Sequence, residues 1–380
     1  MIKLFVTGDN HLCRQYTGSP VKNILVQSRI DSLRQMIRIA ELEECDFFII
    51  TGDLFDRISG IGKKDIDQIV EVLEEFNQTI LIMPGNHDFY TGSEKLWKDF
   101  TSRTGDVSSI ILLNKYQKYS FGVGDNEMVV YPAYCDSKHS KTNRLKWIED
   151  SFESTDSFTI GIAHGTIKGI SPDLKEEYFP MDITELNAIP VDAWLIGHTH
   201  ITYPFDLPYN KDVSGFNIFN PGTHEQLDSG NNTEGNAFII TLDRASGLKQ
   251  VFVRKLQTGT IVYKKITRII ESGELRSLGQ VLQEIGTIVT NRMIIDLEIA
   301  GTVSEEDYNN RIDYYNSALS SALWYSVNDD LLVPAITLDR IHDEYSELSL
   351  AAQFLESLLD DPIEVQMAYD LLKKCNTIGN

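Results

Sequence analysis

Short, continuous runs of apolar residues recur along about the first 250 residues, and each ends in a cluster of Gly, Asp, Asn or His. Apolar runs of this length, bounded by turn residues, are typical of strands buried on both faces. The clearest runs span residues 2–6, 47–50, 80–83, 158–163 and 193–196. Between the first runs, apolar residues recur at helical spacing, as at Ile30, Leu33, Ile37 and Ala40. This alternation of strands and helices predicts an α/β core.

The pattern changes from about residue 236. Two apolar segments, 236–242 and 250–256, flank a Ser246-Gly247 turn and predict an antiparallel pair of strands. A boundary is expected near 257–270. Beyond it the pattern predicts a small α+β module, with strands at 262–269 and 293–299 and helices at about 273–285 and 304–322. Two amphipathic segments close the chain, one carrying Phe354, Leu355 and Leu358 and the other following Pro362.

The length of 380 residues, with 42% hydrophobic and 24% charged residues, is typical of a globular protein of two or three domains. We therefore predict a core domain at 1–260, an α+β domain at 261–345 and C-terminal helices at 346–380. The start of the chain lacks the apolar region of a secretory signal, and no apolar run is long enough to cross a membrane.

The charge of the chain is strongly acidic, with 34 Lys and Arg against 56 Asp and Glu and a net charge of −22. This balance argues against a protein that holds nucleic acid unaided on a broad basic surface, but not against a nucleic-acid substrate. Residues 301–380 contain 15 acidic and 4 basic side chains, which form either a solvated face or a docking surface for a basic partner. Two basic clusters could contact a phosphate backbone or be merely solvated: Lys138, Lys141, Arg144 and Lys146 on a predicted helix, and Arg254, Lys255, Lys264, Lys265 and Arg268.

The four cysteines, at positions 13, 45, 135 and 375, form no C-x-x-C pair and no disulfide framework. Thiols without a pairing pattern are typical of a reducing compartment, so we expect a cytoplasmic protein.

The residues that end the apolar runs are ligand types for a metal ion. In open α/β sheets the carboxyl ends of the strands form the ligand-binding edge, and five strands are expected to present such residues there. The candidates are Asp9, His11, Asp53, Asn86, His87, His164, His198 and His200, with His224 as a nearby possibility. Imidazole, carboxylate and amide donors without thiolates suit Mn²⁺, Fe²⁺ or Zn²⁺ rather than a structural zinc site.

The number and spacing of these donors favour two ions over one. Asp9 and His11 are two residues apart, as are His198 and His200, so in extended backbone both side chains of each pair would point to the same side. Without His87, seven donors remain, which suits two ions that share a bridging carboxylate. Two ions roughly 3.5–4 Å apart lower the pKa of a bound water and clamp the oxygens of a phosphoester.

Five sequence blocks match, in order, those of the calcineurin-like metallophosphoesterases, which this chain resembles. They are Gly8-Asp9-Asn10-His11, Gly52-Asp53-Leu54-Phe55-Asp56, Gly85-Asn86-His87-Asp88, His164-Gly165 and Gly197-His198-Thr199-His200. The match covers about residues 1–225 and implies an αββα sandwich of two mixed sheets. Within this superfamily the chain resembles the SbcD-type DNA repair exonucleases, including the YhaO-like branch. This closer resemblance rests on the Gly-Asp-Leu-Phe-Asp block, the segment 220–225 and the trailing α+β module.

The resemblance implies a role for each residue. One metal would be held by Asp9, His11, Asp53 and His200, and the other by Asp53, Asn86, His164 and His198. Asp53 would thus bridge the two ions. His87 would act on the phosphate as a general acid, and Asp56 occupies the position of the carboxylate that orients this histidine in many relatives.

Two residues depart from a simple match. Arg57 follows Asp56 as in the Asp-Arg-Gly block of phosphoprotein phosphatases, where the arginine binds phosphate, but Ile58 replaces the glycine. An exposed or ion-paired arginine is therefore favoured. His224 is as consistent with a hydrogen-bonded loop residue as with a ligand.

The favoured function is a Mn²⁺-dependent DNA exonuclease or endonuclease that uses two metals. The resemblance implies that residues 261–345 form a capping domain and that the C-terminal helices bind an SMC-like ATPase of the SbcC or YhaN kind. A homodimer acting in DNA repair and recombination is expected. One alternative is a phosphodiesterase or phosphatase for nucleotides or phosphoproteins, which would not need the module after 260. Another is an adaptor with weak residual hydrolysis that bridges an ATPase and other factors.

Overall fold

The computed structural model describes residues 1–105, 107, 109–171, 175–230, 233–270 and 277–378. The chain divides into two compact units, Met1–Val262 and Tyr263–Asn380. This division falls two residues after the predicted end of the first domain. The predicted separation of the C-terminal helices as a third domain stays a prediction.

The first unit contains a seven-stranded mixed sheet in the order β4-β3-β2-β1-β11-β12-β9. Strands β1 to β4 are parallel to one another, whereas β11, β12 and β9 run antiparallel to their neighbours. The predicted strands after residue 236 thus form the expected antiparallel pair, joined at Ser246 and Gly247, both of which have positive φ. The strands are β1 (Ile2–Thr7), β2 (Phe47–Ile50), β3 (Thr79–Ile82), β4 (Ile110–Leu112), β9 (Asp212–Ser214), β11 (Asn236–Ala245) and β12 (Leu248–Gln257).

A second, five-stranded mixed sheet has the order β10-β8-β7-β6-β5. Strands β6, β7, β8 and β10 are parallel, and β5 is antiparallel to β6. The strands are β5 (Tyr119–Val123), β6 (Asn126–Ala133), β7 (Phe158–His164), β8 (Ala193–Gly197) and β10 (Ile218–Phe219).

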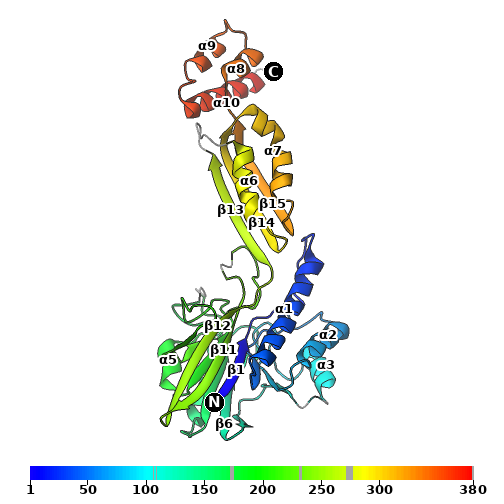
Figure 1. The fold of residues 1–380 in the computed structure, drawn as a ribbon, viewed down its shortest axis with the longest axis vertical. Helices are drawn as coiled ribbons and strands as arrows, with labels where there is room; N and C mark the ends of the chain where they lie inside the picture. Colours follow the sequence, from blue (N-terminus) through cyan, green and yellow to red (C-terminus); the bar gives the residue numbers. More distant parts are fainter. Residues whose placement is uncertain (106, 108, 172–174, 231–232, 271–276, 379–380) are drawn as a thin grey trace. The chain divides into compact units, whose positions relative to one another are not determined.

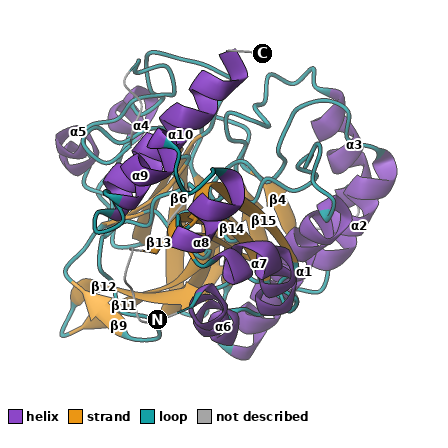
Figure 2. Ribbon diagram, turned by 90° about the horizontal axis from the view of Figure 1, so that it is seen from above, coloured by secondary structure: helices purple, strands orange, loops and turns teal. Residues whose placement is uncertain are grey.

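The two sheets pack face to face between helices, so the first unit is an αββα sandwich, as predicted. Alternate residues of β1 point to opposite faces of the sheet: Leu4 packs against the second sheet, and Phe5 packs under the helices. The helices α1, α2 and α3 cover the outer face of the first sheet, and α4 and α5 cover that of the second (Figures 1 and 2). Their bounds are α1 (Lys22–Leu42), α2 (Lys63–Leu73), α3 (Lys95–Thr104), α4 (Lys146–Ser151) and α5 (Ile183–Ala188).

The helix predicted for the basic cluster at 138–146 is wrong. The described residues 136–145 contain no helix, and α4 begins only at Lys146. Short polar side chains in this segment bond the backbone directly: Ser140 donates to the Thr142 carbonyl, and Asn143 accepts from the Leu145 amide. Such local bonds compete with helix formation.

The second unit is built on a three-stranded sheet in the order β13-β14-β15. Helices α6 and α7 pack on this sheet around one apolar cluster, while α8, α9 and α10 enclose another. The strands are β13 (Val262–Ile270), β14 (Met293–Val303) and β15 (Trp324–Pro334). The helices are α6 (Leu278–Ile288), α7 (Glu305–Ala318), α8 (Leu338–Glu344), α9 (Leu350–Glu356) and α10 (Pro362–Ile378).

Two elements of the second unit, β15 and α8, have no counterpart in the prediction. In β15 only Leu332 is buried, and Asn328, Asp329 and Asp330 interrupt any apolar alternation. The start of the helix predicted at 273–285 lies at 271–276, outside the described residues; α6 itself begins at Leu278. No helix in the described part of the chain is both long and apolar enough to span a membrane.

Candidate metal centre

The loops that follow β1, β2, β3 and β8, together with the last residue of β7, bring the predicted ligands together at the carboxyl edges of the two sheets. The pairwise geometry within these loops differs from the prediction. Asp9, His11, Asp53, His198 and His200 all have positive φ values, between 44° and 101°. Their backbone is therefore not extended, and the expectation that each pair projects from extended backbone is wrong. Non-glycine residues in this conformation are strained, and such strain gathers at functional sites because the surrounding fold imposes it.

The first group of candidate ligands consists of Asp9, His11 and His200. Their possible metal-binding atoms lie within 4.8 Å of one another. The Nε2 atoms of His11 and His200 are 3.0 Å apart, and the second of these lies 3.6 Å from Asp9 Oδ1. Both Asp9 oxygens also accept a hydrogen bond from the His198 amide, which ties the first loop to the last. These three side chains form the candidate site for one of two metal ions.

The second group comprises Asn86, His164 and His198. The Asn86 Oδ1 atom lies 3.0 Å from His164 Nε2 and 2.8 Å from His198 Nδ1. The other ring nitrogen of His164 donates to the Thr51 carbonyl over 2.9 Å, which fixes the ring so that Nε2 faces the site. The second predicted set of ligands is thus also assembled.

Asp53 joins the two groups. Its Oδ1 accepts a hydrogen bond from the His87 amide over 2.8 Å. Its Oδ2 is buried, accepts no hydrogen bond within the described residues, and lies 3.3 Å from His164 Nε2 and 3.9 Å from His11 Nε2. A buried carboxylate oxygen without a donor is costly, and a cation shared by the two groups would satisfy it. The residues therefore fit two divalent ions, with Asp53 placed to contact both.

The electrostatics of the site suit cation binding. Burial alone would raise the pKa of Asp53, but the neighbouring histidines, His164 first, outweigh burial and hold that pKa well below its usual value. Burial lowers the pKa of His11 to about 4 and that of His198 to about 3, so both rings are neutral and can act as ligands at neutral pH. His164 differs: burial would lower its pKa, but the Asp53 charge raises it to about 9.

His87 forms a further candidate group with His11 and Asp53, and the ligand atoms of these three residues lie within 4.8 Å of one another. The Nδ1 of His87 donates to the backbone carbonyl of Asp56 over 2.8 Å, which leaves Nε2 available to a substrate. The Asp56 carboxylate was expected to orient His87, but the hydrogen bond to this ring is made by the Asp56 backbone carbonyl. The Asp56 carboxylate instead lies 3.4 Å from His11 Nδ1 and 3.7 Å from Arg14 Nη1.

A model of the calcineurin-like phosphoesterase family matches residues 2–202, just over half of the chain and all of the segments that carry these candidate ligands. The chain belongs to this family.

Individual relatives are distant from this phosphoesterase. The uncharacterized metallophosphoesterase YhaO of Bacillus subtilis strain 168 is 27% identical over 199 residues, which cover 50% of this chain and 47% of that protein. The match thus spans about half the length of this curated relative. Among solved structures, TT1561 of Thermus thermophilus is 10% identical with a TM-score of 0.41, covering 68% of this chain and 99% of that one. A dimetal phosphatase from Danio rerio is 11% identical with a TM-score of 0.37, covering 67% and 98%.

Two further candidates from the sequence have structural contacts instead. His224 is fully buried, its Nε2 donates to the Arg29 carbonyl over 3.1 Å, and it belongs to none of the ligand groups found among the described residues. Arg57 is half-buried and donates to the carbonyls of Cys13, Ser59 and Gly60, and it forms no ion pair with any residue that the structure describes.

Asp88 is a buried residue of the phosphoesterase site whose role the sequence analysis missed. Its carboxylate accepts from the Gly85 amide over 2.7 Å and from the Phe55 amide over 3.0 Å, and so links the second and third metal loops. Burial, followed by the Asp53 charge, raises its pKa to about 7. Its position directly after the Asn86-His87 pair was the available signal.

Arg29, on α1, was missed as well. Its side chain is almost completely buried and pairs with no carboxylate in the described residues; Nε donates to the Asn10 carbonyl over 2.8 Å. Asn10 lies between the candidate ligands Asp9 and His11, so Arg29 helps to position the first of the loops that carry candidate ligands. The sequence feature that could have indicated this role is a charged residue on the apolar face of the helix, four residues from both Leu25 and Leu33.

Metal binding is expected to release a proton from His164. In the ion-free protein this ring is protonated at pH 8, because its pKa is about 9, and a ligand must be neutral. Binding of Mn²⁺ should therefore release about one proton at pH 8, and affinity should weaken about tenfold per unit as pH falls below this pKa. Calorimetric titration in buffers of different ionisation enthalpy measures this release. The His87→Ala protein should release the same number, and enthalpies that are independent of the buffer would contradict the assignment.

Gly52→Ala should damage the second metal group. Gly52 has a φ of +116°, and a Cβ there would lie 2.1 Å from His164 Nδ1. We expect Mn²⁺ binding to weaken by about tenfold or more, because the ring must move. Gly215→Ala is the matched control, with a φ of +95° and open space around its Cβ. Equal losses in both proteins, measured by calorimetry, would assign the effect to backbone strain alone.

Arg29→Met should leave the Asn10 carbonyl without its donor. We expect about tenfold weaker Mn²⁺ binding, because loss of a group that orients ligands typically costs 10–100-fold in affinity. Leu33→Ala, which truncates a buried side chain on the same helix face, is the control: it should lower the unfolding temperature and leave affinity unchanged. If both variants lose affinity in proportion to stability, Arg29 has only a structural role.

Proposed function

We propose that this phosphoesterase cleaves DNA, as an exonuclease or endonuclease that uses two Mn²⁺ ions. The observation that carries the dimetal assignment is the Asp53 carboxylate, which has one oxygen held by the backbone and the other left between two ligand groups. Asp9, His11 and His200 would hold one ion with Asp53, and Asn86, His164 and His198 would hold the other with it. Ions at such a site lower the pKa of a bound water and neutralise charge on phosphate oxygens.

His87 is proposed to protonate the leaving oxygen. Its backbone amide donates a hydrogen bond to Asp53 Oδ1, and its Nδ1 donates to the Asp56 carbonyl. These two bonds hold both the backbone and the ring of His87 in place. A general acid needs this kind of fixed position within reach of the reacting oxygen. The remaining ring nitrogen, Nε2, would carry the transferred proton.

A short basic segment next to the site supports a polyanionic substrate. The His198 ring packs against Tyr178 and Tyr178 packs against His139, with ring centroids 5.0 Å apart in both pairs. Lys138 and Lys141 lie on either side of His139 in the sequence. Both lysines are exposed and form no ion pair with any described residue. Cations so close to a metal ligand suit the phosphates on either side of the cleaved bond.

Several other basic candidates are already paired with acids. Arg144 binds Asp136 over 2.8 Å, and Lys146 binds Asp150 over the same distance. Near the boundary between the units, Arg254 binds Asp212 and Glu43, and Lys265 binds Glu298. We therefore propose that Lys138 and Lys141, rather than the whole of the two predicted clusters, contact DNA.

The proposed partner is an SMC-like ATPase of the SbcC or YhaN kind, bound through the C-terminal helices. Phe354 on α9 and Met367 and Leu371 on α10 are half or more exposed, which is unusual for large apolar side chains and suits a protein interface. Homodimer formation, action in DNA repair and recombination, and a cytoplasmic location complete the proposal. These features rest on the resemblance to SbcD-type nucleases and on the unpaired cysteines.

The test is cleavage of single- and double-stranded DNA by the full chain with Mn²⁺. His87→Ala should reduce the rate by about 10²-fold or more, because it removes the proton donor, while metal content stays the same. Asp53→Asn is the comparison variant and should lose metal and activity together. Bis(p-nitrophenyl) phosphate, a small diester, is assayed in parallel.

The outcomes separate the parts of the proposal. Cleavage of DNA that depends on His87 supports a nuclease. Hydrolysis of the small diester without cleavage of DNA, even with the ATPase added, would refute DNA as the substrate. Lower metal content in His87→Ala would show that this residue is a ligand, and near-stoichiometric metal in Asp53→Asn would refute the bridge.

A further inference from the structure

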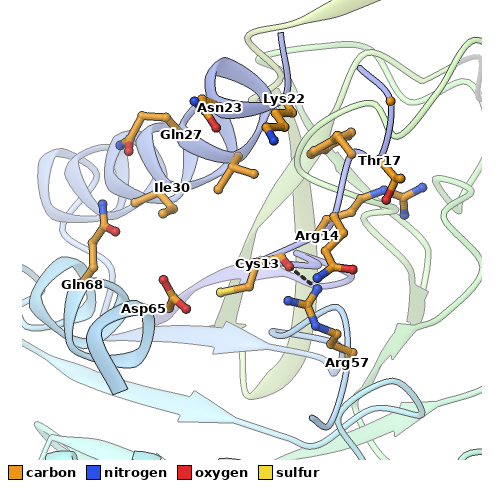
Figure 3. Close-up of a pocket in the computed structure, with 14 residues that line it drawn as sticks. Cys13, Arg14, Thr17, Lys22, Asn23, Gln27, Ile30, Arg57, Asp65 and Gln68 are labelled. Carbon is orange, nitrogen blue, oxygen red and sulfur yellow. Dashed lines mark hydrogen bonds between the residues drawn. The ribbon is translucent and has the colours of Figure 1, made fainter. Parts of the chain in front are cut away.

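We propose that a cavity beside the metal centre binds one nucleotide of the substrate strand. The cavity, of about 510 Å³, lies among the loop that follows His11, the first half of α1 and the start of α2 (Figure 3). Ligand pockets typically have volumes of about 300–1,000 Å³, so this one has room for a nucleoside monophosphate. This inference deepens the proposed function, since it names the part of DNA that is recognised next to the cleaved bond.

The charge of the cavity is opposite to that of the chain. Three cations line it, Arg14, Lys22 and Arg57, against one carboxylate, Asp65. Whereas the whole chain carries a net charge of −22, this cavity is locally positive. Lys22 forms no ion pair with any described residue, and the Asp65 carboxylate is bound to the Gly62 amide. Such a local excess of positive charge is suited to a phosphate group.

The neutral lining is suited to a nucleobase. Carboxamides of Asn23, Gln27 and Gln68 project from two helices around the cavity (Figure 3). Asn and Gln offer a donor and an acceptor side by side and bind the edge of adenine with both. Tyr16 also lines the cavity and offers an aromatic face on which a base can stack.

Arg14 connects the cavity to the metal centre. Its guanidinium carbon lies 5.8 Å from the centre of the Tyr16 ring, and its Nη1 lies 3.7 Å from Asp56 Oδ1. The same Asp56 oxygen lies 3.4 Å from the ligand His11. A nucleotide whose phosphate contacts Arg14 and Lys22 would therefore be adjacent to the first metal group, with its base among the carboxamides. The cavity is thus placed to hold the terminal nucleotide of a strand.

The test is calorimetric titration of the full chain with 2′-deoxyadenosine 5′-monophosphate in EDTA, so that no metal ion holds the phosphate. We expect binding at one site. The double variant K22A/Q68A should bind at least tenfold more weakly. The matched control, K115A/Q78A, changes the same residue types at exposed positions outside the cavity and should bind normally. Thermal unfolding of both variants checks that each is folded.

Three results would overturn the proposal: no binding of the nucleotide, equal affinity in both double variants, or equal affinity for deoxyribose 5-phosphate, which lacks the base. Equal affinity for the sugar phosphate would leave only a phosphate site. An oligonucleotide ending in the same nucleotide should bind at least as tightly as the free nucleotide, and weaker binding would refute a strand end as the ligand. Because these titrations need no catalysis, their failure is distinguishable from a failure to cleave DNA.

Discussion

The buried carboxylate of Asp53 is the constraint on which the rest of the site depends. Removing an unpaired charge from water costs several kcal/mol, so a fully buried Asp needs positive partners around it. The His164 ring supplies one of them, because the Asp53 charge raises its pKa to about 9, and divalent ions held by the two ligand groups would supply the others. The loops must also come close, since a Cβ at Gly85 would lie 2.2 Å from Asp53 Oδ1. Gly85 thus provides the space that this carboxylate requires, and Gly52 provides space for the His164 ring.

The strain of the ligand loops is maintained by the sandwich beneath them. Five candidate ligands have left-handed backbone, which is unfavourable for residues with a side chain and persists only where the surrounding fold imposes it. Here the determinants lie deeper in the protein: the Thr51 carbonyl orients His164, Asp88 joins two loops, and Arg29 holds the Asn10 carbonyl from α1. The rigid, packed sheets therefore fix the positions of the side chains at the candidate metal site.

The sequence predicts the fold of the first unit well, and it singles out candidate ligands that the structure brings close together, because both depend on residue types at the ends of apolar runs. What it does not predict depends on backbone geometry. The contact of Asp56 with His87 is made by a carbonyl, which every residue possesses, so no residue type signals it. Polar side chains bound to nearby backbone replaced the helix expected at 138–146. The strand β15 was missed because only Leu332 within it is buried, which leaves no alternating pattern to detect.

The acidity of the chain is compatible with a polyanionic substrate because electrostatic forces in salt are local. Exposed charges are screened over about 10 Å at 0.1 M ionic strength, so a ligand responds to the side chains around it rather than to the net charge. Residues 301–380 contribute −11 to that net charge. The cations without acidic partners discussed above, Lys22, Lys138 and Lys141, belong to the first unit, which also holds the metal ligands. If the substrate is a polyanion, as proposed, Lys22, Lys138, Lys141 and the bound ions would therefore attract its phosphates locally, whatever the net charge of the chain.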